Sequence, residues 1–138
     1  MAGNVEFVVQ RENVDLLAPH TLIGGVSLPA GAYVSFARTE LAPRGGAAVG
    51  WSARATLRLQ DAQHVVAEDI SYISWGLTDS AGDDVPEKVK PVVLMTSGEL
   101  GDGAQAEFFL DRGGDDQELF ALGGGTLIVM PVDGINIP

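Results

Sequence analysis

Alternation of small apolar and polar residues is clearest between positions 53 and 60. Ala and Leu occupy the odd positions of this stretch, while Arg, Thr and Gln occupy the even ones. A period of two predicts an antiparallel strand with one buried and one solvent-facing side. Other strand-like segments are expected at 5–11, 21–28, 32–40, 69–76, 89–97, 105–111 and 125–132.

Helical periodicity is weak along the whole chain. The best helical candidate is 61–70 (DAQHVVAEDI), but its two central valines disfavour a helix. Clusters rich in Gly and Asp separate the expected strands at 43–46, 78–84, 101–103 and 112–116. Many short strands with such turns predict one all-β domain over 1–138, an antiparallel β-sandwich of jelly-roll or Greek-key type.

The stretch VSLPAGAYVSFA (26–37) interrupts a strand with a Pro and a Gly. Pro29 has no amide proton and a fixed φ, and Gly31 tolerates backbone angles that other residues avoid. Leu28–Gly31 is therefore predicted to be a type II turn. It forms a corner between two strands rather than a catalytic motif.

This corner is followed by ATLRLQ (55–60), AEFFLD (106–111) and GGTLIVMPV (124–132). That order, over residues 20–132, resembles the small jelly rolls of the tumour-necrosis-factor and complement globular-head class, as found in bacteriophage and bacterial structural proteins. The resemblance implies a compact homotrimer whose protomers pack around an apolar seam and serve attachment or decoration. Candidate interface residues are Tyr33, Tyr72, Phe108, Phe109 and Phe120.

Phe108 and Phe109 are adjacent, so their side chains should point to opposite faces of one strand. Two interpretations follow. Either the same domain covers both faces of that strand, or one of the two rings lies at an interface.

Charge is strongly negative and unevenly distributed. The net charge is −11, and residues 78–118 carry eleven acidic side chains against three basic ones, whereas 1–77 carry seven acids and five arginines. Such a surface repels phosphates, so no nucleic-acid partner is expected. Without a leader-like start or a long apolar run, we expect no membrane association and synthesis in a host cytoplasm. Without cysteine, disulfides and thiolate metal sites are excluded.

Catalytic motifs are absent from the sequence. His20 and His64 lack metal-ligand spacing, and the glycines at 123–125 precede a strand rather than a helix, unlike a phosphate-binding loop. We therefore expect no enzyme, no catalytic residue and no cofactor. Trp75 closes an apolar strand and is expected in the core, whereas Trp51 follows a Gly-rich loop and is a candidate for stacking on a ligand such as a sugar.

Acidic turns are the only candidate metal ligands. Carboxylate oxygens in Gly-containing turns suit Ca²⁺, although such residues more commonly bond their own backbone as solvated turns. The weak calcium candidates are Asp79, Asp83, Asp84, Asp111, Asp115 and Asp116.

The favoured function is a non-enzymatic virion structural protein, specifically a bacteriophage capsid decoration protein acting as a trimer. Its expected partners are copies of itself and the major capsid protein or other virion subunits. Terminal arms, about 1–6 and 133–138, are expected to be pinned by such neighbours. The alternative is a ligand- or receptor-binding head of a tail fibre or bacterial surface protein, and an enzyme is the third hypothesis.

Overall fold

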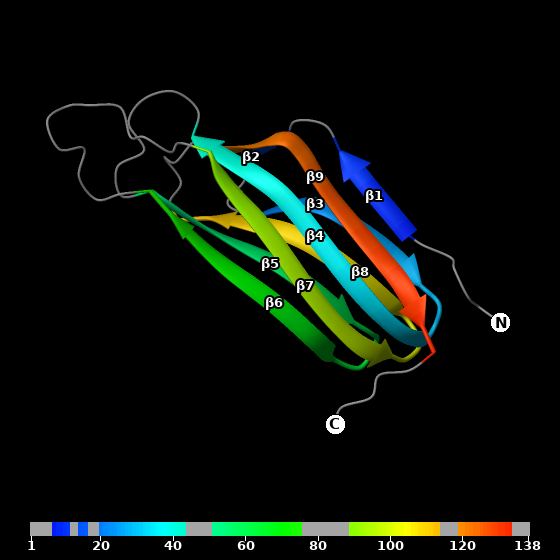
Figure 1. Ribbon diagram of the computed structural model, residues 1–138. Coiled ribbons are helices and arrows are strands. Elements are labelled where there is room, and N and C mark those ends of the chain that lie inside the picture. Colours follow the sequence, from blue (N-terminus) through cyan, green and yellow to red (C-terminus); the bar gives the residue numbers. More distant parts are fainter. Residues whose placement is uncertain are drawn as a thin grey trace, which may run out of the picture.

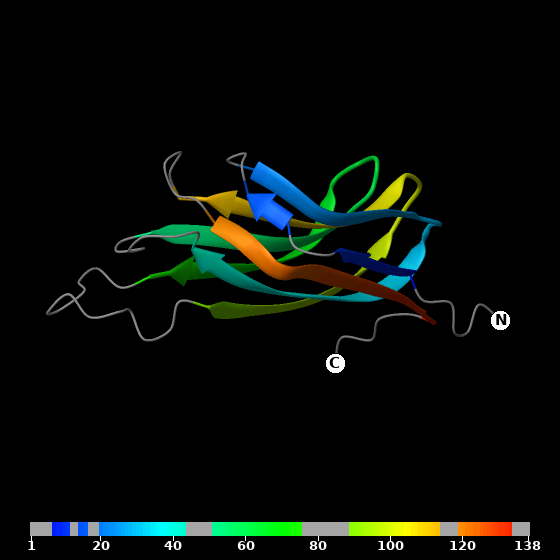
Figure 2. The same cartoon turned by 90° about the horizontal axis from the view of Figure 1, so that it is seen from above.

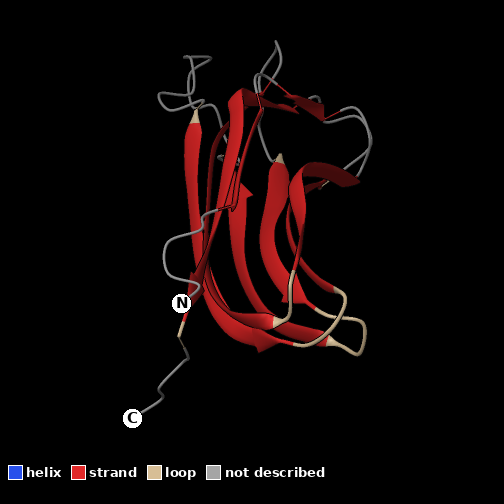
Figure 3. Cartoon of the chain, turned by 90° about the vertical axis from the view of Figure 1, so that its right-hand side faces the viewer, coloured by secondary structure: helices blue, strands red, loops and turns tan. Residues whose placement is uncertain are grey.

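The chain forms a sandwich of two antiparallel β-sheets (Figure 1). The computed structural model describes residues 7–11, 14–16, 20–43, 51–75, 89–113 and 119–133. Every regular element within those ranges is a strand (Figure 3). No helix able to cross a membrane occurs among them. The expected all-β antiparallel sandwich is confirmed.

One sheet has five strands and the other has four, and Figure 2 shows the two layers from another side. The five-stranded sheet has the order β1-β9-β4-β7, with β2 also pairing with β9. The bounds of its strands are β1 (Phe7–Arg11), β2 (Val14–Leu16), β4 (Gly31–Pro43), β7 (Lys90–Leu100) and β9 (Leu119–Val132). The four-stranded sheet has the order β3-β8-β5-β6. Its strands are β3 (His20–Leu28), β5 (Ser52–Gln60), β6 (Val65–Ser74) and β8 (Ala104–Arg112).

Two predicted segments differ from the structure in part. The helical candidate 61–70 is a turn at 61–64 followed by the first part of β6. The carboxylate of Asp61 stabilises this turn by accepting hydrogen bonds from the backbone N–H groups of Gln63 and His64. The expected strand at 69–76 is present as β6, but it begins earlier, at Val65, and ends at Ser74.

The predicted corner connects the two sheets. β3 ends at Leu28 in the four-stranded sheet, and β4 begins at Gly31 in the five-stranded sheet, so only Pro29 and Ala30 make the crossing. The hydroxyl of Tyr33 donates a hydrogen bond to the carbonyl oxygen of Pro29 at 2.6 Å. LPAGAY is thus a short connection between the two sheets, and the buried side chain of its own tyrosine stabilises it through this hydrogen bond.

Large apolar side chains fill the space between the sheets. Trp75 and Phe108 are the largest side chains that are fully buried, which confirms the core position expected for Trp75. Leucines complete this core from both layers, including Leu57 of β5 and Leu127 of β9.

The glycines at 123–125 shape β9 where it crosses the core. The pairing of β4 with β9 shifts between Thr39 and Glu40, and Gly124 has a φ of 74°, which favours glycine. The hydroxyl of Thr39 donates to the Gly124 carbonyl oxygen at 2.5 Å. A Cβ on Gly125 would lie 2.5 Å from Cγ2 of Ile23. These glycines therefore allow a bulge and a close approach between the two sheets.

Candidate functional site: the outer faces of the sandwich

The outer face of the five-stranded sheet is largely apolar. Paired residues of antiparallel strands point to the same side, so each pair continues as a row across the sheet. In one row Phe36 of β4 lies between Met95 of β7 and Ile128 of β9. We call this surface the apolar face and define it by Val34, Phe36, Val93, Met95, Ile128, Met130 and Val132.

The apolar face is open to solvent at its β7 side. The side chain of Val93 is 75% exposed and that of Met95 is 60% exposed. A hollow of about 330 Å³ lies here, with Phe36, Val93 and Ile128 among its lining residues. Adjoining exposed apolar side chains of this kind typically mark a contact surface.

Charge on the apolar face is low compared with the whole chain. The rows through Val34 and Phe36 hold no charged side chain at their described β4, β7 and β9 positions. The charged residues at the outward positions of β4, β7 and β9 are Arg38, Glu40 and Glu99. A second copy approaching this face would therefore meet little of the repulsion expected from a chain of net charge −11.

The outer face of the four-stranded sheet has a different character. Its central row contains Ile70, Thr56, Phe109 and Leu22, from β6, β5, β8 and β3 respectively. Although Phe109 points away from the core, its side chain is only 4% exposed. Arg58 and His20 account for this burial. The guanidinium carbon of Arg58 lies 4.8 Å from the centroid of the Phe109 ring, and the centroid of the His20 ring lies 4.7 Å from it.

This arrangement answers the question raised by the adjacent phenylalanines. Phe108 is fully buried in the core, and Phe109 is covered on the opposite side by polar side chains of the same chain. The structure therefore matches the first interpretation, in which one domain covers both faces of the strand. Neither ring offers an exposed surface to a partner.

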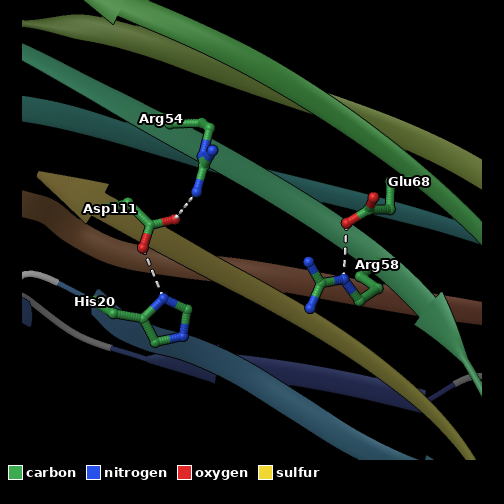
Figure 4. A network of polar contacts seen from close by, with 5 residues as sticks. All are labelled: His20, Arg54, Arg58, Glu68 and Asp111. Carbon is green, nitrogen blue, oxygen red and sulfur yellow. Dashed lines mark hydrogen bonds and ion pairs between the residues drawn. The ribbon is translucent and has the colours of Figure 1, made fainter. Parts of the chain in front are cut away.

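A polar network crosses the same outer face (Figure 4). Asp111 connects two side chains: its Oδ1 lies 2.7 Å from Nδ1 of His20, and its Oδ2 accepts a hydrogen bond from Nη2 of Arg54 at 3.3 Å. Arg58 and Glu68 form a separate ion pair at 2.7 Å. The hydrogen bond from Arg54 to Asp111 and the negative charge of Asp111 raise the pKa of Arg54 above its ordinary value. A hydrogen bond to Tyr72 contributes in the same direction.

The remaining interface candidates have different environments. Tyr33 is 3% exposed and belongs to the core, which corrects its expected place at an interface. Tyr72 is 76% exposed on β6, in the four-stranded sheet. Phe120 lies in β9, where its backbone pairs with Asp15 and Ala42, and its side chain is outside the described part of the structure.

Trp51 is half-buried and packs against the core, and its carbonyl oxygen accepts a hydrogen bond from the backbone N–H of Trp75. Its ring is therefore less available for stacking on a ligand than the ring of Tyr72.

The calcium candidates are not brought together within the described ranges. Asp79, Asp83, Asp84, Asp115 and Asp116 lie outside those ranges, and Asp111 is bonded to His20 and Arg54. The residues that the structure describes contain no group of three side chains suited to a metal ion.

The two histidines lie at opposite ends of the four-stranded sheet. His20 is the first residue of β3 rather than part of a loop, and His64 lies in the turn after β5, beside Asp61. Within the described residues, the fold therefore does not bring them into one site.

Sequence reasoning missed the apolar face, although the pattern held a usable signal. In β4 the two alternating sets are Val34 and Phe36 on one side and Tyr33, Ser35 and Ala37 on the other. The second set contains a serine yet faces the core, where Ser35 donates a hydrogen bond to the Ile128 carbonyl oxygen. Strong apolar residues on both sides of a strand thus indicate a second apolar surface besides the core.

Comparison with known proteins identifies the fold. No protein-family model matches the sequence, and no curated protein matches it. Among solved structures, VP2 of the infectious bursal disease virus subviral particle superposes with a TM-score of 0.59 and 14% identity, over 96% of this chain and 34% of VP2. The structure of the Gt strain of infectious bursal disease virus superposes with a TM-score of 0.58 and 11% identity, over 94% of this chain and 33% of the viral chain. Eiger TNF from S. frugiperda superposes with a TM-score of 0.57 and 11% identity, over 98% of this chain and 96% of the TNF chain.

This chain spans about a third of the length of the two viral chains and nearly all of the TNF chain. At these identities the likeness shows the fold alone, and that fold is the jelly-roll β-sandwich shared by viral and TNF proteins.

Proposed function

We propose that this chain is a non-enzymatic virion structural protein that assembles as a homotrimer. More specifically, it acts as a bacteriophage capsid decoration protein, present in the virion after synthesis in the host cytoplasm. The observation that carries the proposal is the apolar face, an exposed and nearly uncharged sheet surface on a strongly acidic chain. The fold shared with VP2 of a viral particle supports a role in a virion.

In this proposal the apolar face of each copy turns toward a common threefold axis. Burying a large apolar side chain contributes about 1.5–3 kcal/mol, so covering Val93 and Met95 in every copy favours assembly. Both side chains are largely exposed in one copy, so burying them between copies would favour association. The acidic remainder of the surface keeps free copies soluble.

Contact with the major capsid protein or other virion subunits would use surfaces outside the trimer axis. The terminal arms, residues 1–6 and 133–138, are proposed to be pinned by such neighbours. Apart from Asp133, these arms lie outside the described ranges, so the proposal for them rests on the sequence.

The molar mass of the full chain in solution tests the assembly. We expect a trimer for the native chain and a folded monomer for Met95→Glu, because three carboxylates would otherwise be buried near the axis. Ile70→Glu is the matched control, since Ile70 is an exposed apolar residue on the opposite sheet and its variant should stay trimeric. A stable monomer of the native chain would overturn the trimer.

Co-sedimentation with capsid shells tests decoration separately. Native trimer should pellet with shells, and the monomeric Met95→Glu variant should bind them more weakly because it loses multivalency. Failure of the native trimer to pellet with any shell would remove the decoration role and leave the assembly in place.

A further inference from the structure

A second surface, on the sheet opposite the apolar face, has the composition of a ligand site. A hollow of about 360 Å³ lies near the ends of β5, β6 and β8. Its lining includes Arg54, Tyr72, Ser74 and Asp111. This volume falls near the lower end of the range for small-molecule sites, which suits a mono- or disaccharide.

The outward side chains of this hollow form an ordered array. Arg54 pairs with Tyr72 on one side and with Asp111 on the other, so the three side chains share one row across the sheet. Two residues along, Ser52 pairs with Ser74 and extends the same face. Aromatic, cationic, anionic and hydroxyl groups are thus presented side by side from regular strands rather than from loops.

Tyr72 supplies an apolar platform. Its side chain is 76% exposed, although a large aromatic side chain usually buries much of its surface. A sugar ring has one face of C–H groups that can cover an aromatic ring, while its hydroxyl groups remain at the edge. The exposed tyrosine therefore favours a ligand with both an apolar face and a polar rim.

Arg54 and Asp111 supply matched donors and acceptors. Arg54 carries five N–H donors in a rigid plane, and the carboxylate of Asp111 holds that plane through a bond of 3.3 Å. Asp111 is itself anchored on its other oxygen by His20 at 2.7 Å (Figure 4). A donor and an acceptor fixed next to each other can bind two neighbouring hydroxyl groups without rearrangement, which lowers the entropic cost of binding.

The charge of the site selects the kind of saccharide. Arg54 and Asp111 compensate each other, and Arg112 adds one positive charge to the lining. The whole chain has a net charge of −11, which repels polyanions at long range. We propose that Tyr72, Arg54, Asp111 and Ser74 form a binding site for a neutral saccharide. The site lies within one chain, so it does not depend on the proposed trimer, and a trimer would present three copies of it away from the axis.

Saturation-transfer NMR and calorimetric titration of the full chain test this site with maltose, cellobiose and lactose as probes. We expect at least one to bind, with transfer strongest to its C–H protons, and Tyr72→Ala should weaken that binding by about tenfold or more. Tyr72→Phe keeps the ring and should retain most of the affinity. Arg54→Gln should weaken binding, whereas Arg58→Gln, which changes the other ion-paired arginine of β5, should not.

Three outcomes would overturn the inference. They are no binding of any neutral probe at millimolar concentration, binding that Tyr72→Ala leaves unchanged, and binding only of galacturonic acid oligomers. Measuring the molar mass of each variant in parallel separates this result from assembly, because a trimer that binds no saccharide contradicts only the site.

Discussion

The guanidinium carbon of Arg58 lies 4.8 Å from the centroid of the Phe109 ring on the outer surface of the four-stranded sheet. The cation is attracted to the aromatic face, and the long arginine side chain keeps water away from the ring. Arg58 is held in this position by an ion pair with Glu68 at 2.7 Å. Together with His20, Arg58 thus takes the place of the layer of secondary structure that usually covers a buried phenylalanine.

Removing this cover should destabilise the fold and expose the ring. Arg58→Ala is expected to lower the free energy of unfolding by about 0.5–1 kcal/mol or more and to increase binding of a hydrophobic dye. Glu68→Gln is the control, because it breaks only the ion pair, whose contribution is about 0–1 kcal/mol, and leaves the arginine over the ring. Similar dye binding by the two variants would contradict the covering role.

Gly125 should not tolerate a side chain. The Cβ of an alanine there would lie 2.5 Å from Ile23 Cγ2 and 3.2 Å from Phe108 Cε2. We expect Gly125→Ala to lower the free energy of unfolding by about 1–3 kcal/mol in denaturant titrations. Gly25→Ala is the matched control, since its Cβ would make ordinary contact at 3.5 Å with Leu22. A neutral effect at Gly125 would show that the sheets are not closely packed there.

Loss of the Tyr33 hydroxyl should loosen the corner between the sheets. Tyr33→Phe removes the 2.6 Å hydrogen bond to the Pro29 carbonyl oxygen and should cost about 0.5–1.5 kcal/mol of stability at neutral pH. Burial also raises the pKa of the Tyr33 hydroxyl above its ordinary value of 10.0. The folded state therefore favours the protonated form, and its stabilisation is present below pH 10 and is lost as the pH rises through the folded pKa.

Thermal unfolding from pH 8 to 11 measures this effect. The native chain should lose stability on the alkaline side more steeply than Tyr33→Phe does. Tyr72→Phe, which changes an exposed tyrosine, should keep the native pH profile. If both variants flattened the alkaline profile equally, Tyr33 would not be its cause.

Asp61 should make the fold sensitive to acid. Its carboxylate accepts backbone hydrogen bonds from Gly101 at 2.8 Å and from Gln63 at 2.9 Å, and these bonds, with that of Gly101 first, lower its pKa below 3.8. The stabilisation is therefore complete above pH 3.8 and is lost as the pH falls through the lower folded pKa. The Asp61→Ala variant should have a lower melting temperature than the native chain at pH 7. Its melting temperature should also fall less than that of the native chain when the pH is lowered below 3.8.

Asp102→Asn provides the comparison for Asp61. Asp102 is exposed in the adjacent turn and contributes its backbone carbonyl oxygen to Ala62, a bond that the substitution keeps. Its melting temperature and acid profile should match those of the native chain. A shift as large as that of Asp61→Ala would point to overall charge rather than to the bonds of Asp61.

Asp69 should protect an edge of the five-stranded sheet. Its Oδ2 accepts a hydrogen bond at 2.9 Å from the backbone N–H of Met95 in β7, an edge strand. Asp69→Ala releases this amide, so we expect a loss of about 0.5–1.5 kcal/mol and increased light scattering as concentration rises. Glu99→Ala, which removes an exposed charge from the same strand, should not scatter more light than the native chain.

The sequence predicts the strands well where the alternation is long. In β5 the small apolar residues face inward and the arginines outward, as the pattern indicates. β2 escaped prediction because three residues are too few to show a period, and its strand depends on pairing with β9. The start of β6 was missed because the turn at 61–64 depends on the side chain of Asp61 rather than on Gly or Pro.

The covered and exposed faces were harder to predict than the strands. Alternation correctly separates Phe108 from Phe109, but it does not reveal that Arg58, far away in the sequence, lies over the second ring. In β4 the inward side carries Ser35 and Thr39, whose hydroxyls bond to carbonyl oxygens of β9. Hydrophobicity alone therefore favours the wrong side of that strand, and only the pairing of β4 with β9 decides it.

The place of β9 in the five-stranded sheet has a consequence for biosynthesis. β9 follows every other described strand along the chain, yet it lies between β1 and β4 in the sheet. Until the ribosome has released it, β4 has no neighbour on that side, and β1 and β2 have no partner in the sheet. Nascent chains therefore expose three strands that lack this partner, which slows folding and makes chaperone protection valuable until translation has passed residue 132.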